Sequence, residues 1–318
     1  FLKSWADSSL FWESLYRPNF EIHYIFIANL IASVATFLFL IPFYFNLNYR
    51  FNSKLWRQML VYAFPVLVAG VAFSINETFD RILLERLLPE NLSKTAIGKY
   101  SACYKLALFM TLFATAYRLG IEPFFFSRAK DKDAKINYAK ILEFFVIFGA
   151  LILLCVVVFV DLLKIILIPN EAYWEAMDVV PILLLAYLFL GIYHNLSVWY
   201  KITDRTKFGA YISIFGALST LIINLLFIPK FGYMASATAT LMAYAAMAFI
   251  SYILGQKHYK VPYNLKKIGL YLMLSTGFSA LSFYVFREQY LVGFGLILIL
   301  SAVVWAKEKT ELKQLIKS

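Results

Sequence analysis

Charged residues are scarce in this chain. Only 15% of its 318 residues are Asp, Glu, Lys or Arg, whereas 62% are hydrophobic and the mean hydropathy is +0.71. A soluble domain is about 45–50% apolar and about 25% charged, because polar side chains must cover its surface. This chain has too few polar groups for such a surface, so we expect lipid to surround much of the folded protein.

The residues that carry catalysis or bind metals are also few. The chain has three histidines and two cysteines, and both Cys103 and Cys155 lie in apolar runs without metal-ligand spacing. The sequence has no glycine-rich phosphate loop and no nucleophile elbow. We therefore expect no enzyme activity, no metal and no cofactor, and we interpret both cysteines as small buried hydrophobic residues.

Long apolar runs divide the chain into about nine predicted transmembrane helices. A span needs about 20 mostly apolar residues to cross a hydrocarbon core about 30 Å thick. The predicted spans are 22–46, 56–80, 97–122, 139–168, 177–201, 207–228, 232–255, 267–286 and 290–306. The runs lack the two-residue alternation of a β-barrel. The predicted fold class is an all-α membrane protein, a polytopic helical bundle without a large soluble domain.

The net charge of +11 is unevenly distributed between the loops. One alternating set of loops, which includes the C-terminal tail, holds 19 Lys and Arg residues, and the other set holds 9. Basic loops remain in the cytoplasm, so we predict a multi-pass protein of the cytoplasmic membrane with a cytoplasmic C-terminus. The excess positive charge is then a topology signal that also contacts anionic lipid, and we expect no nucleic-acid binding.

Charged residues inside spans usually face a protein interior or a wet cavity. The second predicted span ends with Glu77, Asp80 and Arg81. Glu77 and Arg81 are four residues apart and are expected to pair, because they share one helix face. Either this group is an ion pair at the outer membrane surface, or it faces a cavity.

The third predicted span carries Lys105, Arg118 and Glu122. Lys105 has no acidic partner within one turn, so it either reaches up to the lipid headgroups or lines a cavity for an anion. Arg118 and Glu122 are again four residues apart, which predicts a pair near the cytoplasmic surface.

Two other features concern helix packing. Small residues recur every four positions, which lets helix backbones approach closely. These pairs are Gly209/Ser213, Gly216/Thr220, Ala235/Ala239 and Ser236/Thr240. Asn224 is expected to form an interhelical hydrogen bond, and His194 is interpreted as an interface residue rather than a proton relay.

Several short stretches, taken in order, resemble one family. These stretches are Phe64-Pro65, Asp80-Arg81, Ile97–Leu106, Asn224–Gly232 and Ser236–Thr240. They are similar to stretches in the C-terminal two-thirds of polysaccharide flippases of the multidrug/oligosaccharidyl-lipid/polysaccharide (MOP) exporter superfamily. Ala235 stands where glycine is common in that family, which is a mild departure.

The resemblance implies fourteen helices, of which the nine predicted spans would be the sixth to the fourteenth. It predicts an outer loop and the last helix of a missing N-terminal lobe in 1–54, a six-helix lobe in 55–256, and two trailing helices in 257–318. Because the chain begins at Phe1 without Met, we expect the first five helices to precede it.

The resemblance also implies a function. The expected substrate is a polyprenyl-diphosphate-linked oligosaccharide for surface polysaccharide or lipopolysaccharide synthesis, moved by alternating access. Membrane lipids and polysaccharide-assembly proteins are the other expected partners. The expected roles are substrate binding for Lys105, Arg118 and Tyr104, and gating ion pairs for Glu77, Asp80, Arg81 and Glu122.

Two other functions remain open. A multidrug or cation antiporter of the same superfamily would need a carboxylate deep in a span. A membrane glycan polymerase or acyltransferase would need a sizeable outer loop or a membrane His/Asp pair. The sequence shows no clear sign of either.

Overall fold

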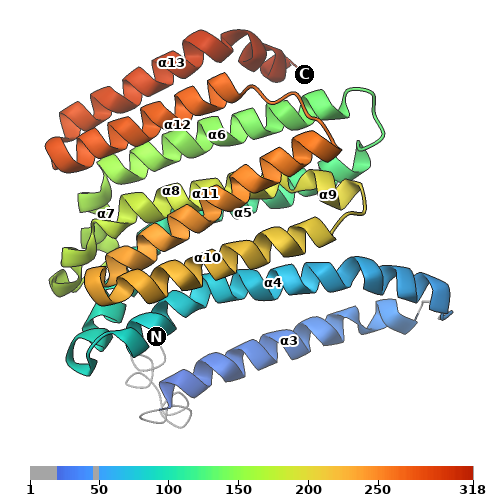
Figure 1. Ribbon diagram of the computed structural model, residues 1–318, viewed down its shortest axis with the longest axis horizontal. Helices are drawn as coiled ribbons and strands as arrows, with labels where there is room; N and C mark the ends of the chain where they lie inside the picture. Colours follow the sequence, from blue (N-terminus) through green and yellow to red (C-terminus); the bar gives the residue numbers. More distant parts are fainter. Residues whose placement is uncertain (1–19, 46–49, 318) are drawn as a thin grey trace. The chain divides into compact units, whose positions relative to one another are not determined.

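The computed structural model describes residues 20–45 and 50–317, and every regular element within those ranges is a helix (Figure 1). The predicted all-α class is therefore confirmed. The predicted outer segment up to residue 19 lies outside the described residues, as do residues 46–49 and residue 318.

Eight of the nine predicted spans coincide with helices that are long and apolar enough to cross a membrane. These are α3 (Glu21–Phe45), α4 (Ser53–Leu87), α6 (Ala134–Val158), α8 with α9 (Val179–Leu196, Val198–Ile202), α10 (Lys207–Phe231), α11 (Tyr233–His258), α12 with the π-helical turn η2 (Leu265–Ala280, Leu281–Val285) and α13 (Tyr290–Lys317). The remaining predicted span lies inside α5 (Glu90–Ser127), which is long but less apolar, since it carries charges such as Lys105 and Arg118.

The chain divides into two compact units, Phe1–Arg57 and Gln58–Ser318. In the first unit, α3 has exposed apolar side chains on all sides, among them Phe26, Phe39 and Phe45. A helix that is apolar all round is suited to lipid. The domain boundaries expected at 54/55 and 256/257 stay predictions.

Helix α8 lies at the centre of the second unit. It packs closely against α5, α6 and α11, and α11 packs in turn against α10. On its other side, α6 contacts α12 and α13, so the two last helices attach to the unit through α6 (Figure 1). The largest apolar cluster of the second unit contains buried side chains of α5, α8 and α10 and so holds these helices in place.

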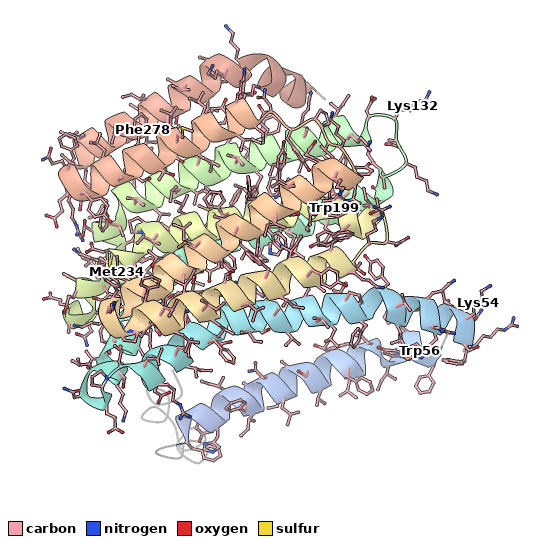
Figure 2. The ribbon with its side chains drawn as sticks, in the orientation of Figure 1. Lys54, Trp56, Lys132, Trp199, Met234 and Phe278 are labelled. Atoms are coloured by element: carbon pink, nitrogen blue, oxygen red, sulfur yellow. The ribbon has the colours of Figure 1, made fainter. Side chains whose placement is uncertain are left out.

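The loops of the second unit lie at two ends. We call one of them the basic end, defined by the connections 128–133, 203–206 and 259–264, which belong to the lysine- and arginine-rich set of loops. These connections lie at the right in Figure 1, and Lys132 projects from the first of them in Figure 2. That the basic end faces the cytoplasm stays a prediction.

The small residues of α10 and α11 are buried in helix contacts, but the α10 set does not face α11 alone. Ser213 is hydrogen-bonded to Tyr193 of α8, and Thr220 is hydrogen-bonded to Asn76 of α4. All four members of the α10 set and all four of the α11 set are buried, and the two helices pack against each other. A Cβ atom at Gly216 would come within 2.2 Å of the Met247 sulfur on α11. The Met247 side chain therefore packs directly on Gly216, and it would have to shift to admit a larger residue there.

The predicted span 139–168 is corrected to a shorter helix. Helix α6 ends at Val158, and the separate helix α7 (Val160–Leu167) follows after Phe159. The reason is a polar cluster in the first turn of α7, where an ion pair fixes the chain to a distant loop.

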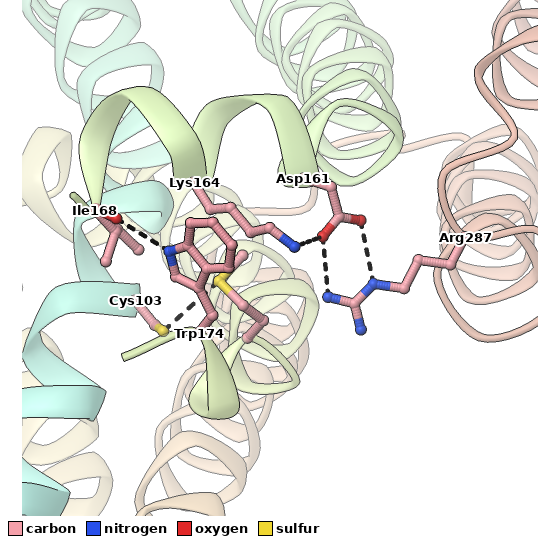
Figure 3. Close-up of polar contacts among 7 residues, drawn as sticks. Cys103, Asp161, Lys164, Ile168, Trp174 and Arg287 are labelled. Carbon is pink, nitrogen blue, oxygen red and sulfur yellow. Dashed lines mark hydrogen bonds and ion pairs between the residues drawn. The ribbon is translucent and has the colours of Figure 1, made fainter. Parts of the chain in front are cut away.

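Asp161 is the centre of that cluster (Figure 3). Its carboxylate accepts hydrogen bonds from Nε and Nη2 of Arg287, both at 3.1 Å, and pairs with Lys164. Arg287 lies between η2 and α13, whereas Asp161 follows α6. Only 5% of the Asp161 side chain is exposed. The ion pair joins the start of α7 to the connection between η2 and α13, at the end of the unit opposite the basic end.

Replacing Asp161 by asparagine is expected to lower the free energy of unfolding by about 1–3 kcal/mol, because charge-assisted hydrogen bonds are lost. Burial alone would raise the pKa of the Asp161 carboxyl, but hydrogen bonds from Arg287 and Lys164 outweigh it and hold the pKa below 3.8. The stabilisation is therefore complete above about pH 5 and is lost progressively as the pH falls through the unfolded and then the lower folded pKa.

Thermal unfolding of the purified protein from neutral to acidic pH measures this effect. The difference between wild type and Asp161→Asn should shrink at the acid end only. Glu171→Gln is the control, since Glu171 is exposed on the same side of the unit. An equal loss in both variants would contradict the role given to Asp161.

A second buried ion cluster joins α6, α12 and α13. Lys267 Nζ lies 2.6 Å from Glu143 Oε1 and 2.9 Å from Glu308 Oε2. Tyr271 donates a hydrogen bond of 2.6 Å to the other Glu308 oxygen. The Glu308 side chain is 1% exposed, so α13 carries a carboxylate that its neighbours fully enclose.

Candidate functional site

Three tyrosine hydroxyls converge on one carboxylate of α4. Glu77 Oε2 accepts hydrogen bonds from Tyr104 of α5 and Tyr187 of α8, each at 2.7 Å, and Oε1 accepts one from Tyr244 of α11. A carboxylate only accepts, and three donors fill most of its capacity. Glu77 thus connects α4 to three other helices of the second unit.

Glu77 lies ten residues before the end of α4 at Leu87. The sequence places it near the end of a span that closes at about residue 80, because the apolar run stops there. The helix instead continues for two further turns, so Glu77 lies well inside α4. Nearby, Asn76 bonds to Thr220 of α10, which makes α10 the fourth helix joined to α4 by a polar side chain.

Arg81 lies beside Tyr104 rather than against the Glu77 carboxylate. Its guanidinium carbon is 4.7 Å from the Tyr104 ring centroid, and Nη1 donates to the Glu77 main-chain carbonyl at 3.0 Å. The ion pair expected from the four-residue spacing is not formed among the described residues, because the tyrosines occupy the carboxylate. Asp80 is 2% exposed and accepts a hydrogen bond of 2.7 Å from the Arg81 main-chain nitrogen.

A cavity of about 530 Å³ lies between α4, α5, α8 and α10 of the second unit. Along α4 its lining runs from Glu77 back to Tyr62, and along α5 it runs from Thr111 to Phe126. The cavity therefore extends from the Glu77 cluster toward the basic end. Its wall contains aromatic rings and hydroxyl groups, for example Phe73 and Ser213.

Four groups that can carry charge line this cavity besides Glu77. They are Arg118 and Glu122 of α5, His194 of α8 and Lys201 of α9. Lys201 Nζ lies 2.5 Å from Glu122 Oε1, and this is a contact between helices. The predicted Arg118–Glu122 pair is therefore wrong, because Glu122 pairs with Lys201. Arg118 makes no ion pair within the described part of the chain.

The other two predicted substrate contacts, Lys105 and Tyr104, do not lie beside Arg118 in the cavity wall. Lys105 is exposed on α5, but it does not line the described cavity. Tyr104 is half-buried and bonds to Glu77. The structure therefore brings Tyr104 and Arg81 to Glu77, of which only Glu77 lines the cavity. Arg118 and Glu122 line the same cavity further along α5, and Lys105 lies apart from them.

Asn224 and His194, the two other polar residues singled out in the spans, have different surroundings in the structure. Asn224 is fully buried, and its amide atoms form no hydrogen bond within the described residues, so the expected interhelical bond is not present. His194 faces the cavity, and its ring lies 6.4 Å from that of Phe73. In the described part of the chain, no group of three or more His, Cys, Asp or Glu side chains is placed to hold a metal ion.

Sequence reasoning missed Tyr187, Tyr244 and Lys201. Each of the two tyrosines lies in an otherwise apolar run, and a buried phenol hydroxyl needs a partner, which is a signal that could have found them. Lys201 is the last residue of the predicted span 177–201 and counts among the lysines and arginines of the basic loop that begins there. Its contact with Glu122 depends on the fold, so no local pattern reveals it.

Comparisons with known proteins bear on this geometry. Residues 65–226 match the model of the MatE family. Among solved structures, the chain is similar to "Lipid II flippase MurJ, inward closed conformation", with a TM-score of 0.63 and 17% identity over 87% of this chain and 61% of that chain. It is also similar to a MOP superfamily transporter from Pyrococcus furiosus, with a TM-score of 0.47 and 18% identity over 71% of this chain and 52% of that chain.

No curated protein gives a significant match to the sequence. At 17% identity, the likeness to the first structure shows a shared fold only. The chain spans about three fifths of that protein's length, since 61% of it is covered.

Proposed function

This chain belongs to the MatE family, within the MOP exporter superfamily, and we propose that it translocates a polyprenyl-diphosphate-linked oligosaccharide across the cytoplasmic membrane. The name of the first structural match supports the proposal, because it describes a flippase of a lipid-linked substrate. The proposed pathway is surface polysaccharide or lipopolysaccharide synthesis. Membrane lipids and polysaccharide-assembly proteins are the proposed partners.

The cavity is the observation that carries the proposal. A preformed cavity of about 530 Å³ is within the usual size of ligand sites, which is about 300–1,000 Å³. The Arg118 guanidinium suits a diphosphate, since arginine binds phosphate oxygens through two parallel hydrogen bonds. Rings and hydroxyls along the same wall suit a polar sugar, which combines an apolar face with hydroxyl groups.

Each predicted site residue keeps a proposed role. Arg118, Tyr104 and Lys105 are the proposed substrate contacts, with Arg118 as the main one because it lines the cavity. Lys105 does not line the cavity and is proposed as a minor contact. The proposed gating residues are Glu77, Asp80, Arg81 and Glu122, whose contacts would change as the cavity opens to alternate sides. The cytoplasmic position of the basic end and of the C-terminus is part of the same proposal, because the substrate would then enter the cavity at this end.

Translocation in proteoliposomes tests the function. The purified protein that contains this chain is reconstituted, and a fluorescent lipid-linked oligosaccharide is followed by its loss of accessibility to an impermeant quencher. Protein-dependent translocation of this lipid, and not of a fluorescent phosphatidylcholine, is the expected result. Equal movement of both lipids, or of neither, rejects the proposal.

A multidrug or cation antiporter of the same superfamily is the second candidate function, and Glu77 favours it. Such a protein needs a carboxylate deep in a span, and Glu77 lies inside α4 at the end of a cavity. Uptake of ethidium into the same proteoliposomes under a proton or sodium gradient distinguishes the two candidates. Gradient-driven ethidium transport without lipid translocation would favour the antiporter.

A further inference from the structure

The Glu122–Lys201 ion pair lies in the cavity wall and joins α5 to α9. The Lys201 side chain is 26% exposed and that of Glu122 is 34% exposed, so both groups are open to the cavity. Arg118 lies one helical turn before Glu122 and lines the same cavity. An anion bound at Arg118 would therefore lie near a second cation, Lys201, which is paired with the Glu122 carboxylate.

Lys201 belongs to a short segment that also contacts α4. Helix α9 has only five residues and is separated from α8 at Ser197. Asp204, with φ of +56°, turns the chain after α9. The buried Thr206 then donates a hydrogen bond of 3.2 Å to the main-chain oxygen of Tyr62 on α4. Movement at Lys201 is thus connected to α4 through five residues of chain.

We propose that Lys201 is a second diphosphate-binding residue, which Glu122 holds in place until an anion bound at Arg118 draws it away. The proposal rests on the proposed function for the origin of the diphosphate. When Lys201 leaves Glu122 for the diphosphate, it still has an anionic partner. The move is favourable because a diphosphate carries more negative charge than one carboxylate. Glu122 is left with access to the cavity, which keeps its charge solvated. Thr206 passes the shift of α9 to α4.

Substitution of Lys201 and substitution of Glu122 are expected to change the affinity for pyrophosphate in opposite directions. Lys201→Gln removes a phosphate ligand and is expected to weaken binding of inorganic pyrophosphate at least 5-fold. Glu122→Gln frees Lys201 and removes a competing negative charge, so pyrophosphate should bind about 3- to 10-fold more tightly. A purely structural ion pair would instead change binding in the same direction in both variants, because each removes the same contact.

The experiment measures stabilisation of the detergent-purified protein against heating as pyrophosphate is added, since a ligand that binds the folded state raises its apparent stability. Lys99→Gln and Glu175→Gln provide a matched control pair at the other end of α5, where Lys99 pairs with Glu175 outside the cavity. Neither control should change the response. Effects of the same sign in the two test variants, or no pyrophosphate binding by the unaltered protein, overturn the proposal.

Anionic lipid headgroups carry phosphate too, so a second arm separates the sources. The same variants are compared in nanodiscs of phosphatidylcholine with and without phosphatidylglycerol. If the opposite-sign effects arise only from phosphatidylglycerol and not from pyrophosphate, the proposal is overturned. Because pyrophosphate binding requires no translocation, binding without flipping would reject the proposed function alone, and flipping without the opposite-sign response would reject only this site.

Discussion

Replacing Glu77 by alanine should lower the free energy of unfolding by about 3 kcal/mol or more, because three tyrosine hydroxyls lose their acceptor at once. Tyr187 and Tyr244 are 2% and 0% exposed, so solvent cannot replace the carboxylate for either. Removal of a partly buried charge recovers part of this loss, since partial burial of an ion costs desolvation energy. The remaining loss should also loosen α4, because Glu77 joins it to three helices.

Heat-induced unfolding of the purified protein gives the measurement. Glu77→Gln keeps one of the two acceptor oxygens and should lose less than the alanine variant. Tyr244→Phe should cost only about 1 kcal/mol, as for one hydrogen bond. Glu85→Ala is the matched control, because Glu85 is an exposed glutamate two turns further along α4. If Glu77→Ala and Glu85→Ala unfold alike, the tyrosine cluster does not hold α4.

Replacing Arg118 by alanine should reduce lipid-linked oligosaccharide translocation about 10- to 100-fold, because hydrogen bonds to a charged group contribute about 1.5–3 kcal/mol each. The stability of the fold should change little, since Arg118 makes no ion pair among the described residues. The expected result is therefore a loss of transport at normal protein levels, measured as the initial rate of translocation in proteoliposomes.

Lys105→Ala provides the comparison for Arg118. Both residues are exposed cations on α5, but only Arg118 lines the described cavity. The expected effect of Lys105→Ala is less than about 3-fold if the cavity holds the diphosphate, which is about 0.7 kcal/mol. A strong loss in Lys105→Ala with full transport in Arg118→Ala would place the diphosphate outside this cavity.

The helices and the burial of their recurring small residues could be predicted because they follow from local patterns. Each apolar run is long enough for a span, and the four-residue recurrence of small side chains predicts close approach. Gly216 shows this directly, since any Cβ there would meet Met247. These features depend on residues near one another in sequence, and the fold reproduces them.

The polar contacts of the site could be predicted only in part. Glu77, Arg118 and Glu122 stand out in the sequence as charges inside spans, and all three line the cavity. Their expected partners were residues four positions away, because only local neighbours are visible in a sequence. Partners on other helices took their place: Tyr104 and two further tyrosines bind Glu77, and Lys201 binds Glu122.

The enclosed carboxylate of Glu308 has a consequence for the order in which the protein is assembled. An unpaired carboxylate is costly to bury at the end of an apolar helix. Its partners, Lys267 and Tyr271, belong to the preceding helix α12, and Lys267 also binds Glu143 of α6. Because α6 and α12 precede α13 in the sequence, the ribosome synthesises both of them before α13. Helix α13 therefore packs against partners that earlier helices already supply, and a chain in which α6 and α12 have not come together leaves the Glu308 carboxylate without them.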